Sequence, residues 1–323
     1  MERPPSPAAE GLRLGWRDVP ARIRVAIEGW LDAPVVAATN QPSGFSPGAA
    51  ARLRTASGRR VFVKAAGPEP NELTPAAHRR EAEIAAALPD EAPVPRLLWS
   101  HDEGEGGWVV LVFEDVEGRN PAVPWRDEEL GRTLVALADL ADLLTPSPLP
   151  PEGVVGHASE WEVLGGRHWR RLMEERPDGL DGWSERNLSA LADLEARAPA
   201  AASAGDTLLH LDLRADNLLL TEERVLVVDW PHARVGASWV DAAFFAPSVG
   251  MQGGPQPEEI LSRLPHARHA DPDALTTVVA AVAGFFTGEG LRPTPPGLPT
   301  LRAFQAAQGE VARSWLARKT GLE

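Results

Sequence analysis

The sequence HLDLRADN, residues 210–217, decides the fold, because it places five polar residues beside apolar runs. LLL follows directly at 218–220, and VVDW comes after a short turn at 227–230. Burying such polar groups costs free energy unless they are paired or bind a ligand such as a metal ion. Asp and Asn also cap the turns of ordinary hairpins, so a purely structural role is the alternative. The occurrence of all these polar residues together, at fixed spacings, favours a functional site over ordinary turn capping.

The spacing His-x-Asp-x-x-x-x-Asn resembles the catalytic loop of protein kinases, and Asp229 follows where that fold has its metal-binding aspartate. Phosphoryl transfer needs a carboxylate that orients the attacking hydroxyl and accepts its proton, and we assign this role to Asp212. The side-chain oxygens of Asn217 and Asp229 are hard ligands suited to Mg²⁺. Arg214 can face charge on the transferred phosphoryl group. His210 completes the catalytic set and is expected to brace the loop by hydrogen bonding.

The same segment is similar to the aminoglycoside phosphotransferase family, a branch of the protein-kinase-like fold. SGFSPG at 43–48 resembles the family's nucleotide-positioning loop, which implies that Ser46 contacts the nucleotide. Lys64 ends the apolar run 61–63, as the family's phosphate-binding lysine ends its third strand. It is also one of only two lysines among 32 basic residues. Arginine does not replace a compact ammonium in a narrow site, so Lys64 is a candidate on physical grounds as well.

A carboxylate partner for Lys64 is expected on the next helix. Glu81 occupies the family's position for this partner. Glu83 is the alternative, and it would point to a different face because it lies only two residues further along the helix.

The apolar run 108–113 leads into EDVEG at 114–118, which resembles the family's hinge. The resemblance implies that the carbonyl of Glu114 and the N–H of Val116 pair with the base. Phe62 would stack on the base, or would simply pack in the core.

The resemblance covers roughly residues 44–241 and has departures. Leu211 stands where the family often has glycine, and Asp229 is followed by Trp-Pro rather than the Phe-Gly of protein kinases. Asp241 matches the aspartate that supports the catalytic loop, or it caps a helix. These departures leave the expected reaction class intact and leave the acceptor open.

The organisation of the chain predicts an α+β, protein-kinase-like fold with two lobes. Helical spacing is expected over 21–31, 76–88, 128–144, 185–197, 274–286 and 301–316, and short β-type runs over 35–38, 61–63 and 108–113. We therefore expect a nucleotide-binding lobe at 1–116, with 1–10 as a loose tail, and a helical lobe at 117–323 that carries the catalytic loop and the acceptor site.

The composition restricts the partners. The longest apolar run, 278–286, is shorter than the roughly 20 residues that span a bilayer, so no membrane crossing is expected. The net charge of −14 argues against nucleic acid and suits a cationic partner. The chain has no cysteine and begins without the basic and apolar layout of a secretory signal, which predicts a cytoplasmic protein. The oligomeric state stays open.

The resemblance implies a small-molecule O-phosphotransferase that uses ATP, or alternatively GTP, with Mg²⁺. Its acceptor is expected to be a hydroxyl of a cationic compound such as an aminoglycoside-like antibiotic. The segment 160–195, rich in Asp and Glu and carrying Trp161, Trp169 and Trp183, is a candidate wall for such an acceptor through ion pairs and cation–π contacts. The alternative is a solvated helical face whose tryptophans turn into the core. The alternatives are a kinase of a housekeeping metabolite (choline, homoserine or sugar type) and a nucleotide-binding pseudokinase.

Overall fold

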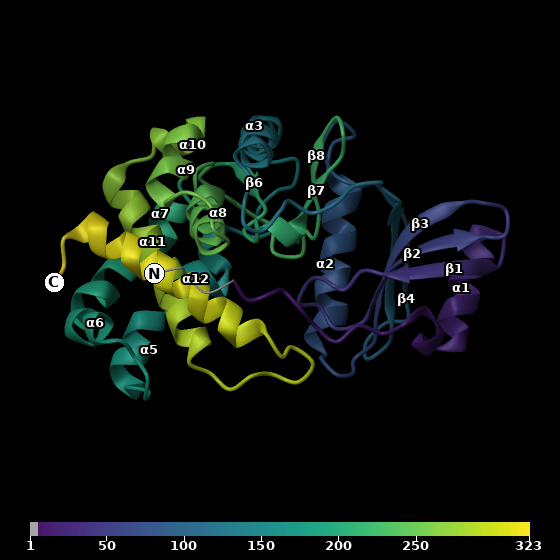
Figure 1. Ribbon diagram of the computed structural model, residues 1–323, viewed down its shortest axis with the longest axis horizontal. Helices are drawn as coiled ribbons and strands as arrows, with labels where there is room; N and C mark the ends of the chain where they lie inside the picture. Colours follow the sequence, from purple (N-terminus) through teal and green to yellow (C-terminus); the bar gives the residue numbers. More distant parts are fainter. Residues whose placement is uncertain (1–5) are drawn as a thin grey trace.

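The computed structural model describes residues 6–323, which form a small β-rich lobe and a larger helical lobe (Figure 1). The small lobe is built on one antiparallel sheet with the strand order β1-β2-β3-β5-β4. Its elements are α1 (Ala21–Leu31), β1 (Val35–Asn40), β2 (Ala49–Thr55), β3 (Arg60–Ala66), α2 (Leu73–Ala87), β4 (Leu97–Asp102) and β5 (Val109–Glu114). The expected two-lobed α+β fold is confirmed.

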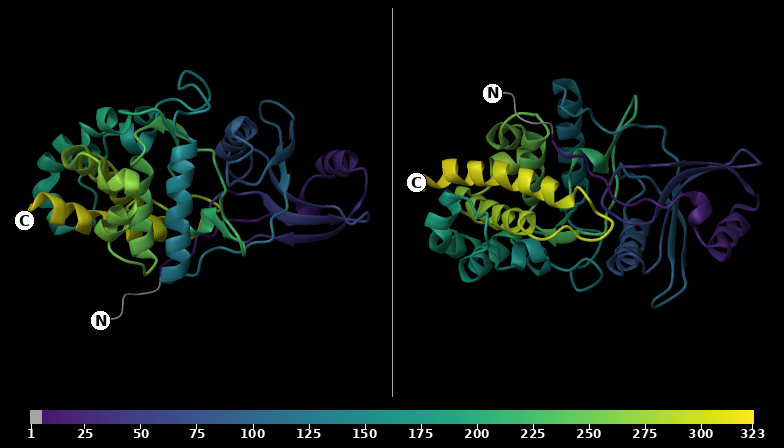
Figure 2. Two further views of the ribbon diagram at one scale, coloured as in Figure 1. Left: turned by 90° about the horizontal axis from the view of Figure 1, so that it is seen from above. Right: turned by 60° about the horizontal axis from the view of Figure 1, so that its bottom comes forward.

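Strand β3 separates the core of the small lobe from the cleft. Val61 and Val63 are buried against α1, whereas Phe62 and Lys64 point to the opposite face of the sheet, where α2 lies. This follows from the period of two along a strand. The two helices therefore cover opposite faces, and α2 lies between the sheet and the helical lobe (Figures 1 and 2).

The helical lobe surrounds α11 (Pro272–Gly290), whose residues 277–284 are all buried. A helix that is apolar on all sides belongs inside a bundle. It packs against α4 (Glu162–Gly165), α5 (His168–Glu175), α6 (Gly182–Glu195), α7 (Ala198–Ala202), α8 (Val240–Met251) and α12 (Leu301–Thr320). The lobe also contains α3 (Asp127–Leu143), α9 (Pro257–Arg263) and α10 (Pro265–Arg268). None of the described helices is long and apolar enough to cross a membrane.

Two small antiparallel pairs carry the catalytic segment, namely β6 (Thr207–Leu209) with β9 (Arg234–Gly236) and β7 (Leu218–Leu220) with β8 (Val225–Val227). They leave residues 210–217 at the face of the helical lobe that meets the small lobe.

Each predicted helix is present, but several elements were not predicted, among them β2 and α8. The strand β2 is rich in alanine, which is depleted in strands. The helix α8 is buried almost throughout, so it lacks the periodicity that reveals a surface helix.

The expected loose tail, residues 1–10, lies partly outside the described residues. Within the described part, the N–H of Gly44 donates to the carbonyl of Ala9 at 2.9 Å. The backbone of Glu10 exchanges hydrogen bonds of 3.2 Å with the hydroxyl of Thr300. Both lobes thus hold the end of this stretch.

Candidate active site

The catalytic loop is held from behind by Asp241 and His210. The carboxylate of Asp241 accepts the N–H groups of His210 and Leu211 at 2.9 and 2.7 Å. His210 is fully buried, and its Nδ1 accepts the N–H of Asp212 at 3.1 Å while its Nε2 donates to the carbonyl of Val228 at 3.0 Å. Burial lowers the pKa of His210 to about 4, so the ring is neutral. His210 positions the loop and does not reach the cleft.

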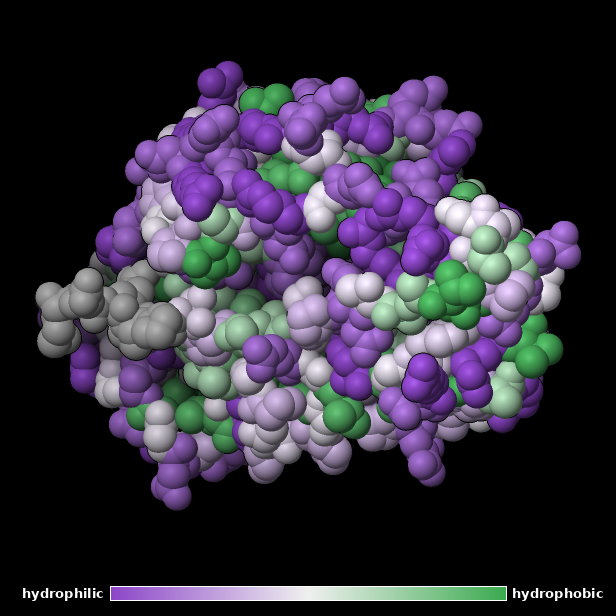
Figure 3. Space-filling model, turned by 45° about the vertical axis from the view of Figure 1, so that its right-hand side comes forward, coloured by the Kyte–Doolittle hydropathy of each residue, from purple (hydrophilic) through white to green (hydrophobic). Residues whose placement is uncertain are grey.

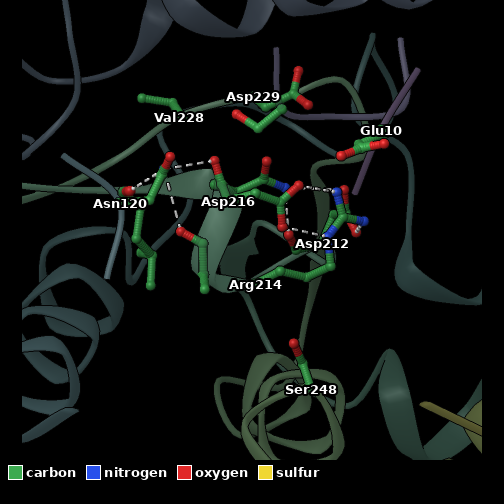
Figure 4. Close-up of polar contacts among 12 residues, drawn as sticks. Glu10, Asn120, Asp212, Arg214, Asp216, Val228, Asp229 and Ser248 are labelled. Atoms are coloured by element: carbon green, nitrogen blue, oxygen red, sulfur yellow. Dashed lines mark hydrogen bonds and ion pairs between the residues drawn. The ribbon is translucent and has the colours of Figure 1, made fainter. Parts of the chain in front are cut away.

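Asp212 is placed as the expected base. One carboxylate oxygen accepts Arg214 Nη1 at 2.6 Å, and the other accepts Asn217 Nδ2 at 3.1 Å. Figure 4 shows Asp212, Arg214 and Asp216 gathered in one cluster, with Asp229 nearby. Burial raises the pKa of Asp212 to about 7, although Arg214 opposes this shift. A carboxyl group that titrates near neutral pH suits a general base.

Arg214 joins the catalytic loop to both lobes. Its Nε and Nη2 donate to Asp216 at 3.0 Å each, in addition to the contact with Asp212. Its guanidinium also lies 5.4 Å from the ring centre of Phe45 and 5.5 Å from that of Phe304, within the range of cation–π contacts. Phe45 belongs to the loop 43–48 of the small lobe and Phe304 to α12 of the helical lobe, so this arginine contacts both lobes.

Lys64 binds two carboxylates from different elements. Its Nζ lies 2.6 Å from Glu81 Oε1 and 2.7 Å from Asp229 Oδ1. The alternative partner, Glu83, is exposed. Burial opposes the charge on Lys64, but Asp229 and Glu81 outweigh it and raise the pKa of the ammonium. The structure therefore shows the Lys64–Glu81 pair and adds Asp229 to it.

One cleft between the lobes collects the residues expected to bind nucleotide and metal. Its lining includes Ser46, Phe62, Lys64, Glu81, Glu114, Val116, Asn217 and Asp229. The face drawn in Figure 3 is hollowed near its centre and mostly hydrophilic around the hollow. Asp212 and Arg214 lie next to this lining through their contacts with Asn217 and Asp216.

The hinge segment is fixed by charge pairing. Asp115, whose side chain is 3% exposed, accepts Arg52 Nε at 2.5 Å and Arg60 Nε at 2.7 Å. The N–H of Val116 has no hydrogen-bond partner among residues 6–323. A free N–H at the edge of a cleft can pair with an acceptor on a planar ring.

The side-chain oxygens of Asn217 and Asp229 are suitable ligands for a magnesium ion. The amide nitrogen of Asn217 donates to Asp212, which leaves its oxygen available to a cation, and Asp229 adds a carboxylate. Mg²⁺ usually takes one or two protein ligands beside phosphate oxygens and water. Within the described part of the chain, no cluster of three or more His, Cys, Asp or Glu side chains is arranged to hold a metal by itself.

Two residues of the site escaped the sequence analysis. Asn120 donates to the carbonyls of Ala215, Asp216 and Leu218 at 3.4, 3.2 and 2.8 Å and so ties the catalytic loop to the connector between the lobes. Arg13 lines the cleft from a segment without periodicity. No local pattern marks either residue.

The surroundings of Leu211 explain how this position tolerates leucine where the family often has glycine. Its φ is +65°, in the left-handed region that favours glycine, while its side chain is buried at 1% exposure. Burial of the leucine side chain offsets a backbone strain of about 1 to 3 kcal/mol.

The acidic segment 160–195 does not line this cleft. Trp169 is completely buried and donates from Nε1 to the carbonyl of Ala280 at 2.7 Å, so it follows the alternative and turns into the core instead of reaching an acceptor. Trp183 donates to the carbonyl of Leu322 at 3.0 Å. Trp161 instead lies 5.8 Å from the ring of His232, three residues after Asp229.

Comparisons with known proteins agree with the two-lobed fold. Among solved structures, aminoglycoside phosphotransferase APH(4)-Ia is 14% identical with a TM-score of 0.61, covering 92% of this chain and 98% of its own. Choline kinase LicA from Streptococcus pneumoniae is 14% identical with a TM-score of 0.59, again covering 92% and 98%. The amicoumacin kinase hAmiN is 12% identical with a TM-score of 0.54, covering 86% and 88%. At these identities the likeness shows the fold alone.

No curated protein matches the sequence significantly. Residues 42–276 match the model of a family described as the phosphotransferase enzyme family. This match covers most of the chain and includes both the loop 43–48 and the catalytic segment. The protein therefore belongs to the phosphotransferase enzyme family and is a phosphotransferase that acts on hydroxyl groups.

Proposed function

We propose that the protein transfers the γ-phosphoryl group of ATP, or alternatively GTP, to a hydroxyl of a cationic small molecule. One observation carries this proposal, namely that Lys64 and Asp229 line one cleft and that Asp212, with a pKa near 7, contacts Asn217 of the same lining. A phosphate anchor and a general base would thus lie close together at the cleft. This is what transfer between a nucleotide and an alcohol requires.

The acceptor hydroxyl would donate a hydrogen bond to the carboxylate of Asp212. Its oxygen forms a bond to the γ-phosphorus while the bond from that phosphorus to the bridging oxygen breaks and ADP leaves. The hydroxyl proton passes to Asp212, which later releases it to water. Arg214, 2.6 Å from Asp212, holds the base in place and offsets negative charge that builds on the phosphoryl oxygens.

Lys64 would bind the nucleotide phosphates, oriented by Glu81. Asn217 and Asp229 would hold Mg²⁺, which when bound neutralises phosphate oxygens. Ser46 would contact the phosphates from the loop, Glu114 and Val116 would pair with the base edge, and Phe62 would lie against its face.

Charge supports a cationic acceptor. The chain carries a net charge of −14, which attracts cations over long range. Solved neighbours include a complex of APH(4)-Ia with ADP and hygromycin B and a choline kinase. Aminoglycosides and choline are positively charged at neutral pH. The choline kinase also keeps a housekeeping metabolite as the second candidate for the acceptor.

A pseudokinase is disfavoured because Lys64, Asp212, Asn217 and Asp229 are all present and contact one another: Lys64 pairs with Asp229, and Asn217 donates to Asp212.

The test is acceptor-dependent release of ADP from ATP and Mg²⁺ by the purified chain. The panel holds aminoglycosides, choline, homoserine and neutral sugars, with phosphorus NMR to identify the product and Asp212→Asn as the inactive control. We expect turnover with a cationic hydroxyl compound. Turnover with neutral sugars alone would favour the metabolite kinase, and tight ATP binding without turnover on any acceptor would favour the pseudokinase.

A further inference from the structure

The segment 9–14 runs along the nucleotide loop and connects the two lobes. The N–H of Leu12 donates to Gly297 in the helical lobe at 2.7 Å, and the N–H of Leu14 donates to Gly48 in the small lobe at 2.9 Å. Figures 1 and 2 agree that this N-terminal stretch crosses from the helical lobe to the small sheet. It therefore delivers side chains to the mouth of the cleft.

Arg13 is the side chain that this segment places in the cleft. Its Nη1 donates to the carbonyl of Ser46 and its Nη2 to that of Ser43, so the guanidinium closes the loop 43–48 from one side. Gly44 makes room for it, since a Cβ there would lie 2.7 Å from Nη2. Two of the five guanidinium N–H groups are thus used, and Nε is buried without a partner among residues 6–323.

The charges around the cleft distinguish Arg13 from the other cations. Lys64 is paired with Glu81 and Asp229, and Arg52 is paired with Asp115. Arg13 also lines the cleft, but no carboxylate of the described residues lies within 4 Å of it. Burial lowers the pKa of the Arg13 guanidinium, and Asp229 and Asp216, which lie further away, partly oppose this shift. Arg13 is therefore the described cation of the cleft whose charge is still available to a ligand.

We propose that Arg13 binds the terminal phosphates of the nucleotide. A polyphosphate needs cationic donors beyond the already paired Lys64, and an arginine offers a planar fork that matches phosphate oxygens. Arg13 keeps its contacts with the loop carbonyls while its remaining N–H groups turn toward the phosphates. It would thus couple closure of the loop to the presence of a charged nucleotide. This inference rests on the proposed use of a nucleoside triphosphate.

The test compares ligands that differ in phosphate number. Calorimetric titration of adenosine, ADP and ATP with Mg²⁺ is performed on the full chain, on Arg13→Met and on Arg17→Met, an exposed arginine shortly after this segment. We expect Arg13→Met to weaken ATP binding about 10- to 100-fold, as loss of charged hydrogen bonds does, ADP binding less, and adenosine binding not at all. Arg17→Met should match the wild type for all three.

Equal weakening of adenosine and ATP would overturn the inference, because it would reduce Arg13 to a support of the loop. No weakening of either ligand would overturn it as well. Should the methionine variant unfold, Arg13→Lys serves instead, because it keeps a positive charge but loses the planar guanidinium. We again expect binding of ATP to weaken most, binding of ADP to weaken less, and binding of adenosine to stay unchanged. A wild-type chain that binds neither ATP nor GTP would instead remove the proposed function, and this inference with it.

Discussion

The ammonium of Lys64 lies 2.7 Å from the carboxylate of Asp229, so strand β3 of the small lobe is joined by an ion pair to the segment after β8 of the helical lobe. Because Lys64 also binds Glu81, one ammonium serves two carboxylates. If nucleotide and Mg²⁺ bind as proposed, phosphates would compete with Asp229 for Lys64, and the cation would compete with Lys64 for Asp229. Nucleotide and Mg²⁺ should therefore rearrange this pair together.

Lys64→Arg should impair nucleotide use although it keeps the charge. The guanidinium is larger and directs its hydrogen bonds differently, so it cannot contact Glu81, Asp229 and phosphate as the ammonium does. We expect kcat/KM for ATP to fall by about tenfold or more, measured by ADP release. Lys319→Arg changes the chain's other lysine and should behave as the wild type. Full activity of Lys64→Arg would contradict the assigned role.

Asp212→Asn should lower kcat by a factor on the order of 10² to 10⁴, because a positioned base is lost. Binding of the nucleotide should change little, since Asp212 is not among the residues that line the nucleotide cleft. The matched control is Asp206→Asn, an exposed position just before β6. Near-normal turnover of Asp212→Asn would remove the assignment.

The same base predicts a pH profile. Asp212 must be deprotonated to accept a proton, and burial raises its pKa to about 7. Activity should therefore rise with pH up to about 7 and then level off. His210 and His232, with pKa values of about 4, titrate below this range. A flat profile of kcat/KM between pH 5.5 and 8 would contradict this prediction.

Asp229→Ala should uncouple metal from nucleotide. If Asn217 and Asp229 hold Mg²⁺, the ion tightens ATP binding in the wild type by about tenfold or more, and the variant loses this gain. Calorimetric titration of ATP with and without Mg²⁺ measures the coupling, and Asp206→Ala is the control. The same coupling in Asp229→Ala would place the metal elsewhere.

Glu195→Gln should change how stability depends on pH. Glu195 accepts the N–H groups of His168 and Trp169 at 2.8 and 3.0 Å, and burial raises its pKa from 4.5 to about 7. The folded state then binds a proton more tightly than the unfolded chain, so this glutamate stabilises most below pH 4.5 and its contribution falls as the pH rises to 7.

Glutamine is neutral at every pH, so Glu195→Gln removes the contribution of Glu195 to the pH dependence of the free energy of unfolding. Denaturant unfolding at pH 5 and pH 7.5 should show a smaller difference in the free energy of unfolding for Glu195→Gln than for the wild type, by on the order of 2 kcal/mol. Glu185→Gln, on the exposed side of α6, should keep the wild-type difference. An unchanged difference in Glu195→Gln would show that Glu195 titrates normally.

The acceptor should respond to salt. Attraction between a chain of net charge −14 and a cation weakens as added salt shortens the Debye length from about 10 Å at 0.1 M to about 3 Å at 1 M. KM for the acceptor should rise with ionic strength while kcat changes little. A KM that is indifferent to salt would remove the cationic acceptor and favour a neutral metabolite.

The sequence by itself determined the fold class, the catalytic segment and the partner of Lys64. Local spacing rules and the resemblance to the aminoglycoside phosphotransferase family suffice for these features. The alternation along β3 places Phe62 and Lys64 on one face, and the spacing from Asp212 to Asn217 fixes a loop short enough for the two side chains to meet at 3.1 Å.

Only the tertiary structure decided which distant residues complete the site. Arg13 meets Ser46 across 33 positions, and Asn120 meets Leu218 across 98. Trp169 turned into the core rather than toward an acceptor, because α11 packs against α5 and offers the carbonyl of Ala280. Such contacts depend on how elements far apart in the chain pack together, and no local pattern of residues encodes that packing.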